Sequence, residues 1–429
     1  MKSKLNDTLY LHIDGKGLTF IYSYSQEIMQ LKLKQITILF ICLSVGNFTT
    51  ACRLVTPVSS RSKTVTQLSN PSVKQRQMLE PLFPIAENLQ EGYINPSGEI
   101  VISPQFDQAL PFAEGLAGVK IDGKFGFIDQ KGKLVIPLQF DEVRNFFQGL
   151  ARVAIDKKWG IIDHTGKFIV TPHFEEIFDF SEGLAAVSID DKWGFIDETG
   201  KLVIRPQFDF ARSFSGGLAR IEVKNRWGST SRWGYIDKTG KIIIQPQFEQ
   251  AFDFSEGLAV VRMGNKQGFI DKTGQIVIPP KEFRFTQSFS EGFAVALVAS
   301  SYKNGVADGY KFGFIDKTGR WVIPPEFDGA ESFSQGLAAV KIDMMWGFID
   351  KTGQIVISPQ FDQVGSFVDG MASVTISDKQ GFIDKTGKLV ISPKFDQVGV
   401  FSQGLALVII GDQFGYIDKT GKYIWNPTN

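Results

Sequence analysis

Cysteine and histidine are scarce in this chain of 429 residues. The two cysteines, Cys42 and Cys52, both lie near the N-terminus. The long region after Cys52 therefore has no disulfide framework, no cysteine-ligated zinc site and no thiol nucleophile. The three histidines are His12, His164 and His173. Two histidines in one stretch, without further ligands nearby in sequence, predict surface variation and not a metal site.

Charge of one sign is also lacking, because 46 basic residues balance 46 acidic ones. A surface that binds nucleic acid normally appears as a basic excess, so we expect no nucleic-acid partner. The sequence contains no phosphate-binding Walker loop, no G-x-S-x-G elbow and no H-E-x-x-H zinc motif. We therefore expect no cofactor, no metal and no enzymatic activity.

The longest apolar run, residues 36–46, is too short for a transmembrane helix of about 20 residues. Lys32 and Lys34 precede it, and small polar residues follow up to Thr49-Thr50-Ala51-Cys52. This order predicts a signal peptide over residues 29–51, read from Met29, with residues 1–28 as a non-native extension. An uncleaved membrane anchor and a buried helix are the alternatives.

The segment T-T-A-C resembles a bacterial lipobox, in which Cys52 would carry the lipid, although Thr49 stands where Leu is usual. We expect export to the cell envelope, in the periplasm or at the surface, with membrane contact only through the signal peptide or a lipid at Cys52. Residues 52–90 are rich in Ser, Thr, Pro and Gln, which predicts a solvated linker.

A repeat fills residues 91–427 in nine to ten copies. The glycine of a G-F-I-D motif recurs mostly every 34 residues, at Gly92, Gly126, Gly160, Gly194, Gly234, Gly268, Gly313, Gly347, Gly381 and Gly415. A second glycine follows each one after six residues. Looking for such a period comes first, because it decides the architecture.

Residues 174–204 illustrate one copy. A loop, F-E-E-I-F-D-F-S-E-G, leads to the strand L-A-A-V-S-I. A tight turn at Asp190-Asp191 joins it to the strand K-W-G-F-I-D, and E-T-G joins that to a third strand, K-L-V-I. The second turn fits a three-residue hairpin loop whose glycine adopts the left-handed conformation. Each copy is thus predicted to be a three-stranded antiparallel meander.

Apolar residues on both faces of these strands predict that neighbouring copies stack on each other. A propeller blade usually has four strands over about 40–50 residues. The shorter three-stranded unit therefore favours an all-β, open, elongated or superhelical array, with a closed propeller-like ring as the alternative. The first copy, residues 92–106, reads as a cap that lacks its leading strand.

The motifs W-G-I-I-D-H-T-G-K, W-G-F-I-D-E-T-G-K and W-G-Y-I-D-K-T-G-K, each followed by V-I-x-P-x-F or a close variant, resemble the bacterial WG-containing β-repeat. The resemblance covers residues 92–427. Several copies depart from it, with Phe125, Gln267, Phe312, Gln380 and Phe414 in place of the Trp. The resemblance implies a repeat module of largely uncharacterised function and no catalytic residues.

The repeated acids favour structural roles. D-K-T-G resembles the phosphorylated segment of P-type ATPases, but six copies inside a hairpin indicate turn chemistry. Each turn has too few acids for a calcium loop. Asp179, Glu182, Asp253 and Glu256 lie in repeated F-x-F-S-E-G loops, whereas a glycosidase needs one acid pair in a cleft. Trp159, Trp193, Trp233 and Trp346 read as core between copies, with an exposed stacking ladder as the alternative.

Two copies carry insertions in the same turn. The first insert contains Arg226, Trp227 and Arg232, and the second contains Tyr302, Lys303, Asp308 and Tyr310. Inserts in arrays often lie on one face and bind partners, although tolerated drift in loop length is an equal alternative. We predict a non-catalytic protein- or glycan-binding or scaffolding protein. The alternatives are an envelope glycan hydrolase that uses carboxylates between copies, and a structural spacer.

Overall fold

A computed structural model describes residues 12–14, 17–19 and 80–428, except residues 226–229, 281–282, 304–305 and 308. The chain divides into two compact units, residues 1–75 and 76–429. In the first unit, β1 (His12–Asp14) and β2 (Gly17–Thr19) pair antiparallel. No helix in the described part of the chain is long and apolar enough to cross a membrane.

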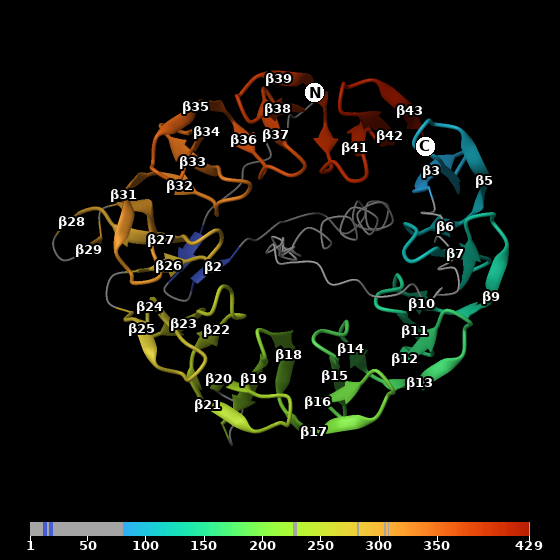
Figure 1. The fold of residues 1–429 in the computed structure, drawn as a ribbon, viewed down its shortest axis with the longest axis horizontal. Helices are drawn as coiled ribbons and strands as arrows, with labels where there is room; N and C mark the ends of the chain where they lie inside the picture. The colour runs from blue at the N-terminus through green and yellow to red at the C-terminus, as the bar shows by residue number, and fades with distance from the viewer. Residues whose placement is uncertain are drawn as a thin grey trace, which may run out of the picture. The chain divides into compact units, whose positions relative to one another are not determined.

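The described part of the second unit forms ten consecutive antiparallel sheets, here named blades 1 to 10 in chain order. Blade 1 has three strands, and blades 2 to 10 have four each. Figure 1 shows the blades arranged in a ring, with the first strand of each four-stranded blade toward the centre and the last strand outside. The fold of this unit is therefore a ten-bladed propeller.

The strands fall into four positions within the blades. The first strands are β6 (Gln108–Ala109), β10 (Glu142–Val143), β14 (Glu176–Ile177), β18 (Phe210–Ser215), β22 (Gln250–Ala251), β26 (Phe285–Thr286), β32 (Gly329–Ala330), β36 (Gln363–Val364) and β40 (Gln397–Val398). The second strands are β3 (Phe83–Glu87), β7 (Leu116–Ile121), β11 (Leu150–Ile155), β15 (Leu184–Ile189), β19 (Leu218–Lys224), β23 (Ala259–Met263), β27 (Ala294–Ala299), β33 (Ala338–Ile342), β37 (Met371–Ile376) and β41 (Leu405–Ile410).

The third strands are β4 (Gln90–Ile94), β8 (Lys124–Asp129), β12 (Lys158–Asp163), β16 (Lys192–Asp197), β20 (Ser231–Ile236), β24 (Lys266–Ile270), β30 (Tyr310–Ile315), β34 (Met345–Ile349), β38 (Lys379–Asp384) and β42 (Gln413–Asp418). The outermost strands are β5 (Ile100–Phe106), β9 (Leu134–Phe140), β13 (Phe168–Phe174), β17 (Leu202–Phe208), β21 (Ile242–Phe248), β25 (Ile276–Ile278), β31 (Trp321–Phe327), β35 (Ile355–Phe361), β39 (Leu389–Phe395) and β43 (Tyr423–Thr428). A short extra hairpin, β28 (Tyr302–Lys303) and β29 (Val306–Ala307), belongs to blade 7.

Tight turns connect the strands as the sequence predicts. Asp190 and Asp191, between β15 and β16, both have positive φ, 49° and 57°. Such a pair matches the right-handed twist of a two-residue hairpin. Gly200, in the turn before β17, has φ +82°, and its N–H donates to Asp197 O over 2.9 Å. The left-handed glycine predicted for this turn is confirmed.

The W-G glycine allows the outermost strand to cross closely over the third strand. A Cβ at Gly234 would lie 2.5 Å from Ile244 O and 2.7 Å from Pro246 N. The register between β20 and β21 shifts at this point. Backbone atoms cannot swing aside as a side chain can, so only glycine fits the crossing.

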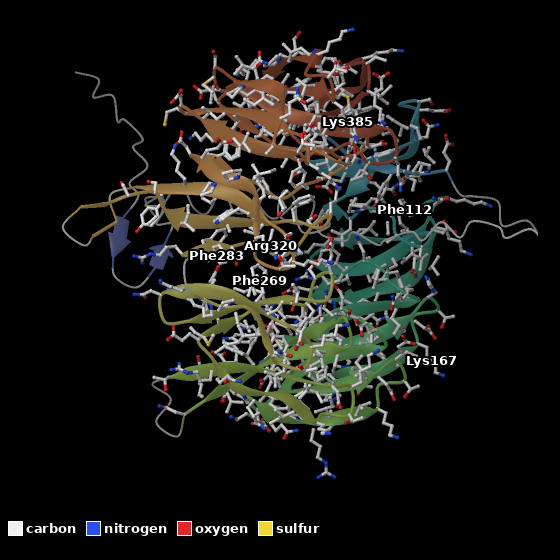
Figure 2. The ribbon with its side chains drawn as sticks, turned by 60° about the vertical axis from the view of Figure 1, so that its left-hand side comes forward. Phe112, Lys167, Phe269, Phe283, Arg320 and Lys385 are labelled. Carbon is white, nitrogen blue, oxygen red and sulfur yellow. The ribbon has the colours of Figure 1, made fainter. Side chains whose placement is uncertain are left out.

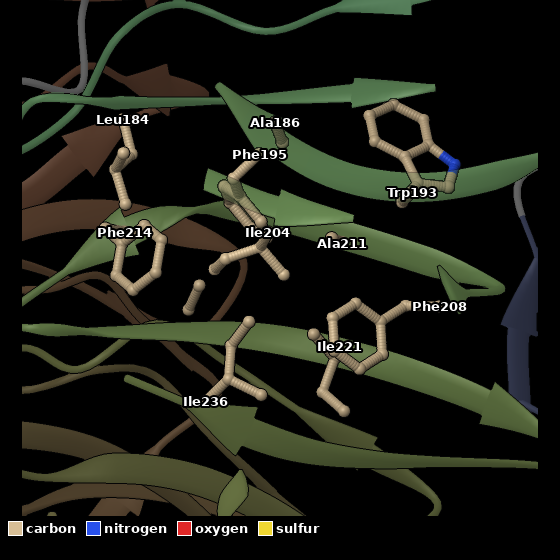
Figure 3. Packing of buried hydrophobic residues seen from close by; sticks show 11 residues of the cluster. Leu184, Ala186, Trp193, Phe195, Ile204, Phe208, Ala211, Phe214, Ile221 and Ile236 are labelled. Carbon is tan, nitrogen blue, oxygen red and sulfur yellow. The ribbon is translucent and has the colours of Figure 1, made fainter. Parts of the chain in front are cut away.

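The hydrophobic core lies between neighbouring blades. Figure 3 shows one such cluster, in which Trp193, Phe195 and Ile204 of blade 4 pack against Phe214 and Ile221 of blade 5. Similar clusters join blade 1 to blade 2, blade 3 to blade 4, and each successive pair from blades 5 and 6 to blades 9 and 10. Each blade thus buries its two faces against two different neighbours, as stacking of the copies predicts.

The ring closes where blade 10 meets blade 1. Ile85 and Ile94 of blade 1 form a buried cluster with Leu405 and Tyr416 of blade 10. The hydroxyl of Thr428 donates to Ala86 O over 2.5 Å. The open array predicted from the sequence is therefore wrong, and its alternative, the closed ring, is correct.

Two details explain that difference. The predicted loop at the start of each copy contains a further short strand, such as β14, so a blade has four strands instead of the predicted three. This first strand is mostly two residues long, whereas the outermost strand is mostly seven, which makes each blade wide outside and narrow inside. The first blade also starts earlier than predicted, because β3 lies inside the interval 52–90 that the sequence assigned to a linker.

Candidate binding surface

The D-x-T-G aspartates hold their own turns. Asp237 Oδ1 accepts hydrogen bonds from Thr239 N over 2.9 Å, from Thr239 Oγ1 over 2.6 Å and from Lys241 N over 3.1 Å. The Thr239 hydroxyl is the main reason that the pKa of Asp237 lies below its usual range. The same bonds recur in the other turns of this type, for example at Asp350 and Asp418. The structure thus supports the turn interpretation of D-K-T-G.

The S-E-G acids and the turn lysines form a clasp between blades. Glu182 of blade 4 accepts a hydrogen bond from Gly217 N of blade 5 over 3.0 Å. Its carboxylate lies 3.2 Å from Lys238 Nζ, which also donates to Glu182 O over 2.8 Å. The clasp recurs for Glu256 with Lys317 and for Glu291 with Lys351. Figure 2 marks Lys167, Arg320 and Lys385, which stand in or beside such turns. These acids are therefore distributed around the ring and do not converge on one point.

The aromatic residue of W-G lies at the boundary between blades. Trp193 is only 7% exposed, and its ring centroid lies 4.9 Å from those of Phe178 in blade 4 and Phe210 in blade 5. Trp159, Trp233 and Trp346 are partly buried against core clusters. The interpretation of the tryptophans as core is thus confirmed, and the alternative of a freely exposed ladder is wrong.

Polar residues at this position use a different contact. Glu91 Oε2 accepts a hydrogen bond from Ala109 N of blade 2 over 2.5 Å. Burial raises the pKa of the Glu91 carboxyl to about 7. The equivalent bonds run from Thr286 N to Gln267 Oε1, 2.6 Å, and from Val398 N to Gln380 Oε1, 2.8 Å.

Arginine gathers in one sector of the ring. In residues 80–428 every arginine falls between Arg144 and Arg320, which places them in blades 3 to 7. Four of them stack on aromatic rings in blades 3 to 7. These contacts join Arg144 to Trp159, Arg212 to Phe178 and Phe210, Arg220 to Trp233 and Phe252, and Arg284 to Tyr310, over 4.9–6.0 Å. Single arginines stand out in the sequence, but their clustering becomes visible only when equivalent positions of the copies are compared.

Both inserts lie in the hairpin between the second and third strands, in blades 5 and 7. Since the second strand ends and the third begins there, they stand at the opposite end of the blade from the D-x-T-G turns. Figure 1 shows β28 and β29 outside the ring. Arg232 lies in β20, and Tyr310 opens β30 with an exposed ring.

The remaining insert residues are described in part or not at all. Tyr302 and Lys303 form β28. Arg226, Trp227 and Asp308 lie outside the described residues, as does Cys52. The structure therefore brings the two inserts to one end of the blades, with blade 6 between them.

The histidines do not converge. His164 stacks on Phe146 with centroids 4.4 Å apart, and its Nε2 lies 3.2 Å from Glu114. His173 Nδ1 lies 2.7 Å from Thr171 O. Within the described residues, no group of three or more His, Cys, Asp or Glu side chains could hold a metal ion.

Solved structures resemble this chain at low sequence identity. A eukaryotic initiation factor is 12% identical, with 82% of this chain and 100% of that chain covered and a TM-score of 0.48. The β-propeller domain of the Trilobed protease from Pyrococcus furiosus is 11% identical, with 60% and 100% covered and a TM-score of 0.33. No curated protein matches the chain.

The sequence model of the WG containing repeat matches nine consecutive segments, each beginning at the W-G position of a third strand. They are residues 92–125, 125–159, 159–193, 193–227, 233–266, 268–302, 312–343, 346–379 and 381–413. Each segment covers the end of one blade and the beginning of the next, so the sequence repeat is offset from the structural blade. The chain belongs to the WG-containing repeat family.

Proposed function

We propose that this propeller is a non-catalytic binding or scaffolding protein that holds a protein or glycan partner in the cell envelope. One observation carries the proposal: ten blades share one pattern, yet the stacked arginines and both inserts occur only in blades 3 to 7. A ring that only had to fold would need no such difference between its ten blades. Chemistry confined to one sector favours a ligand that meets the ring from that side.

The clasps support a scaffolding role. Each joins a turn of one blade to two backbone or side-chain groups of the next, as Glu182 does with Gly217 and Lys238. A ring with such contacts at successive boundaries presents its surface residues at fixed separations. Fixed separations lower the entropy lost when a partner binds.

The location in the envelope rests on the sequence of residues 29–52, which lie outside the described part of the chain. We propose cleavage before Cys52 and lipid attachment at its thiol. Cells grown with radiolabelled palmitate should label the wild-type protein and not Cys52→Ser. Labelling of neither form, with the protein soluble in the periplasm, overturns the lipid anchor and leaves export standing.

The binding function is tested by capture from envelope extract and on a glycan array. The full chain is compared with a variant in which residues 225–230 and 300–309 are replaced by Gly-Asn, the two-residue turn found at Gly264-Asn265. We expect the wild-type chain to capture a defined partner and the variant to lose it, with equal thermal unfolding of both. Capture of nothing by either form favours the spacer, and shortening of an arrayed glycan favours the hydrolase.

A further inference from the structure

Blades 3 to 6 carry one set of side chains twice, at an interval of two blades. The first set is Arg144 and Arg152 of blade 3 with Phe178 and Asp179 of blade 4. The second set is Arg212 and Arg220 of blade 5 with Phe252 and Asp253 of blade 6, at the same positions of the repeat. In Figure 1 the first strands of these blades, β10, β14, β18 and β22, lie on the inner side of the ring.

One arginine of each set is fixed between blades. Arg152 Nη2 lies 2.7 Å from Asp179 Oδ1, and its Nη1 donates to Ile177 O over 2.5 Å. Burial is the main reason that the pKa of Arg152 lies below its usual range. The arginine side chain is 19% exposed and its aspartate 58%, so the carboxylate still faces solvent.

The second set repeats this geometry. Arg220 Nε lies 2.6 Å from Asp253 Oδ1, and its Nη1 donates to Ala251 O over 2.5 Å. The exposures are 16% for the arginine and 52% for the aspartate. Two fixed pairs of the same construction therefore stand two blades apart.

The other arginine of each set makes no ion pair shorter than 3.6 Å with the residues that the structure describes. Arg212 stacks over Phe178 at 5.4 Å and Phe210 at 4.9 Å, and it makes no ion pair with any residue that the structure describes. Arg144 stacks over Trp159 at 5.1 Å, and its Nη1 donates to Val143 O over 3.4 Å. Among the described residues its one ion pair is a 3.6 Å contact with the exposed Glu142. A guanidinium placed over an aromatic ring keeps N–H groups that can bind a carboxylate as a two-bonded fork.

The other blades do not offer this chemistry. The residues at the position of Arg144 and Arg212 are Leu110, Gln287, Glu331, Gly365 and Gly399 in blades 2, 7, 8, 9 and 10. Phe178 and Phe252 occupy the same position in blades 4 and 6. Arginine and phenylalanine thus alternate over four successive blades, and Arg212 contacts the ring of its neighbour Phe178.

We propose that the two sets are similar subsites, both built on an exposed stacked arginine, for an acidic glycan whose carboxylate-bearing sugars repeat along the chain. Arg144 and Arg212 bind one carboxylate each, and the partly exposed side chains of Phe178 and Phe252 contact the sugars. Two arginines at the same repeat position, two blades apart, fit a polymer with a regular repeat better than a peptide, whose side chains vary. This inference rests on the proposed binding function and names its ligand class.

The probes are oligogalacturonates of defined length, their fully methyl-esterified forms and oligoglutamate of similar charge, measured by isothermal titration with the full chain. Arg212→Ala and Arg144→Ala should each weaken oligogalacturonate binding about tenfold or more, the size of a charge-assisted bond. Arg212→Lys should also weaken it, because a lysine keeps the charge and loses the fork. The matched control is Arg205→Ala, since Arg205 is exposed on the outermost strand β17.

Each outcome decides the proposal. Tight binding of the acidic oligomer, loss on esterification and loss in the Arg144 and Arg212 variants support it, provided that the variants unfold at the wild-type temperature. Equal binding by those variants overturns the site. Oligoglutamate bound as tightly through the same arginines overturns the glycan class in favour of an acidic peptide. No binding of the oligomer, with capture of another envelope partner intact, overturns this inference while the proposed function stands.

Discussion

Glu91 and Ala109 join the first two blades through one short bond, in which the Glu91 carboxylate accepts the Ala109 N–H over 2.5 Å. At other boundaries a tryptophan or phenylalanine occupies the place of Glu91, or a glutamine makes the equivalent bond, as Gln380 does to Val398 N. A neutral amide can therefore do what the carboxylate does. Because Glu91 can ionise, the stability of this boundary depends on pH, whereas the boundaries with glutamine lack that dependence.

Glu91→Gln should remove that dependence. The carboxyl has an ordinary pKa of 4.5 and a folded-state pKa of about 7, raised by burial. Between these values it is protonated only in the folded chain, so the free energy of unfolding falls as the pH rises through this window, by on the order of 2–3 kcal/mol. Urea unfolding at pH 4.5 and pH 8 should show the decrease in the wild type and little of it in Glu91→Gln.

The reciprocal control is Gln380→Glu, which should introduce a similar decrease at the boundary of blades 9 and 10. The described carboxyl groups with lowered pKa, such as Asp237, titrate below the window and do not disturb the comparison. Equal slopes in wild type and Glu91→Gln between pH 4.5 and pH 8 would contradict the assignment.

Replacement by alanine should lower the free energy of unfolding by different amounts at Gly234 and at Gly257. Gly234→Ala places a Cβ 2.5 Å from Ile244 O, whereas Gly257→Ala meets no atom within 4 Å and only has to adopt φ +92°. We expect about 1–2 kcal/mol for Gly257→Ala, from the left-handed backbone alone. Gly234→Ala should cost about 3 kcal/mol or more, because the clash is with backbone. Urea midpoints of the two variants give the comparison, and equal losses would contradict it.

Local patterns predicted most of each blade. The strands around Ala185 and Phe195 and the turn at Gly200 follow from alternation and turn residues, which act within a few positions. The two-residue strand β14 escaped prediction because two residues carry no periodicity. Closure escaped it as well, since the angle between blades depends on packing across boundaries, as between Trp193 and Phe210.

The candidate surface was predicted less completely. The inserts and their common turn were visible as departures from the repeat, and Tyr310 is indeed exposed at that end of its blade. The pairs Arg152–Asp179 and Arg220–Asp253 join residues of adjacent copies. Arg152 is the third residue of β11, and its aspartate belongs to the next blade. Such a contact between copies can be seen only once the ring places neighbouring blades side by side.

The two clasp residues Glu182 and Lys238 should contribute unequally to the free energy of unfolding. Lys238→Ala should cost less than about 1 kcal/mol, because both side chains of its pair with Glu182 are partly solvated. Glu182→Ala should cost more, because Gly217 N also loses its acceptor. Thermal unfolding of both variants tests the order, and a larger loss for Lys238→Ala would show that the charge contact dominates the clasp.

Blade 1 completes the ring without a first strand among the described residues. Elsewhere a phenylalanine that follows the first strand packs on an aromatic ring of the preceding blade, as Phe146 packs on Phe127 with centroids 5.0 Å apart. At the closure Phe83 packs on Tyr416 with centroids 5.4 Å apart. Phe83 pairs with Ile94 as Ala117 pairs with Ile128, so a large side chain stands where the next blade has alanine.

Phe83→Ala should therefore weaken the closure specifically. The variant leaves a cavity beside Tyr416, and we expect a loss of about 2–4 kcal/mol, less than for a fully buried phenylalanine because Phe83 is partly exposed. Phe83→Leu keeps much of the volume and should lose less than half of this. Thr428→Val removes the hydroxyl bond to Ala86 O at the same boundary and also the acceptor of the Trp425 Nε1–H, and it should add a further loss of about 1–2 kcal/mol. Hydrogen exchange followed by mass spectrometry should show faster exchange in β3 and β42 of Phe83→Ala, with the strands of blade 5 unchanged. Uniform acceleration over all blades would mean that the ring unfolds as one unit. It would contradict a local role of Phe83 at the boundary of blades 1 and 10.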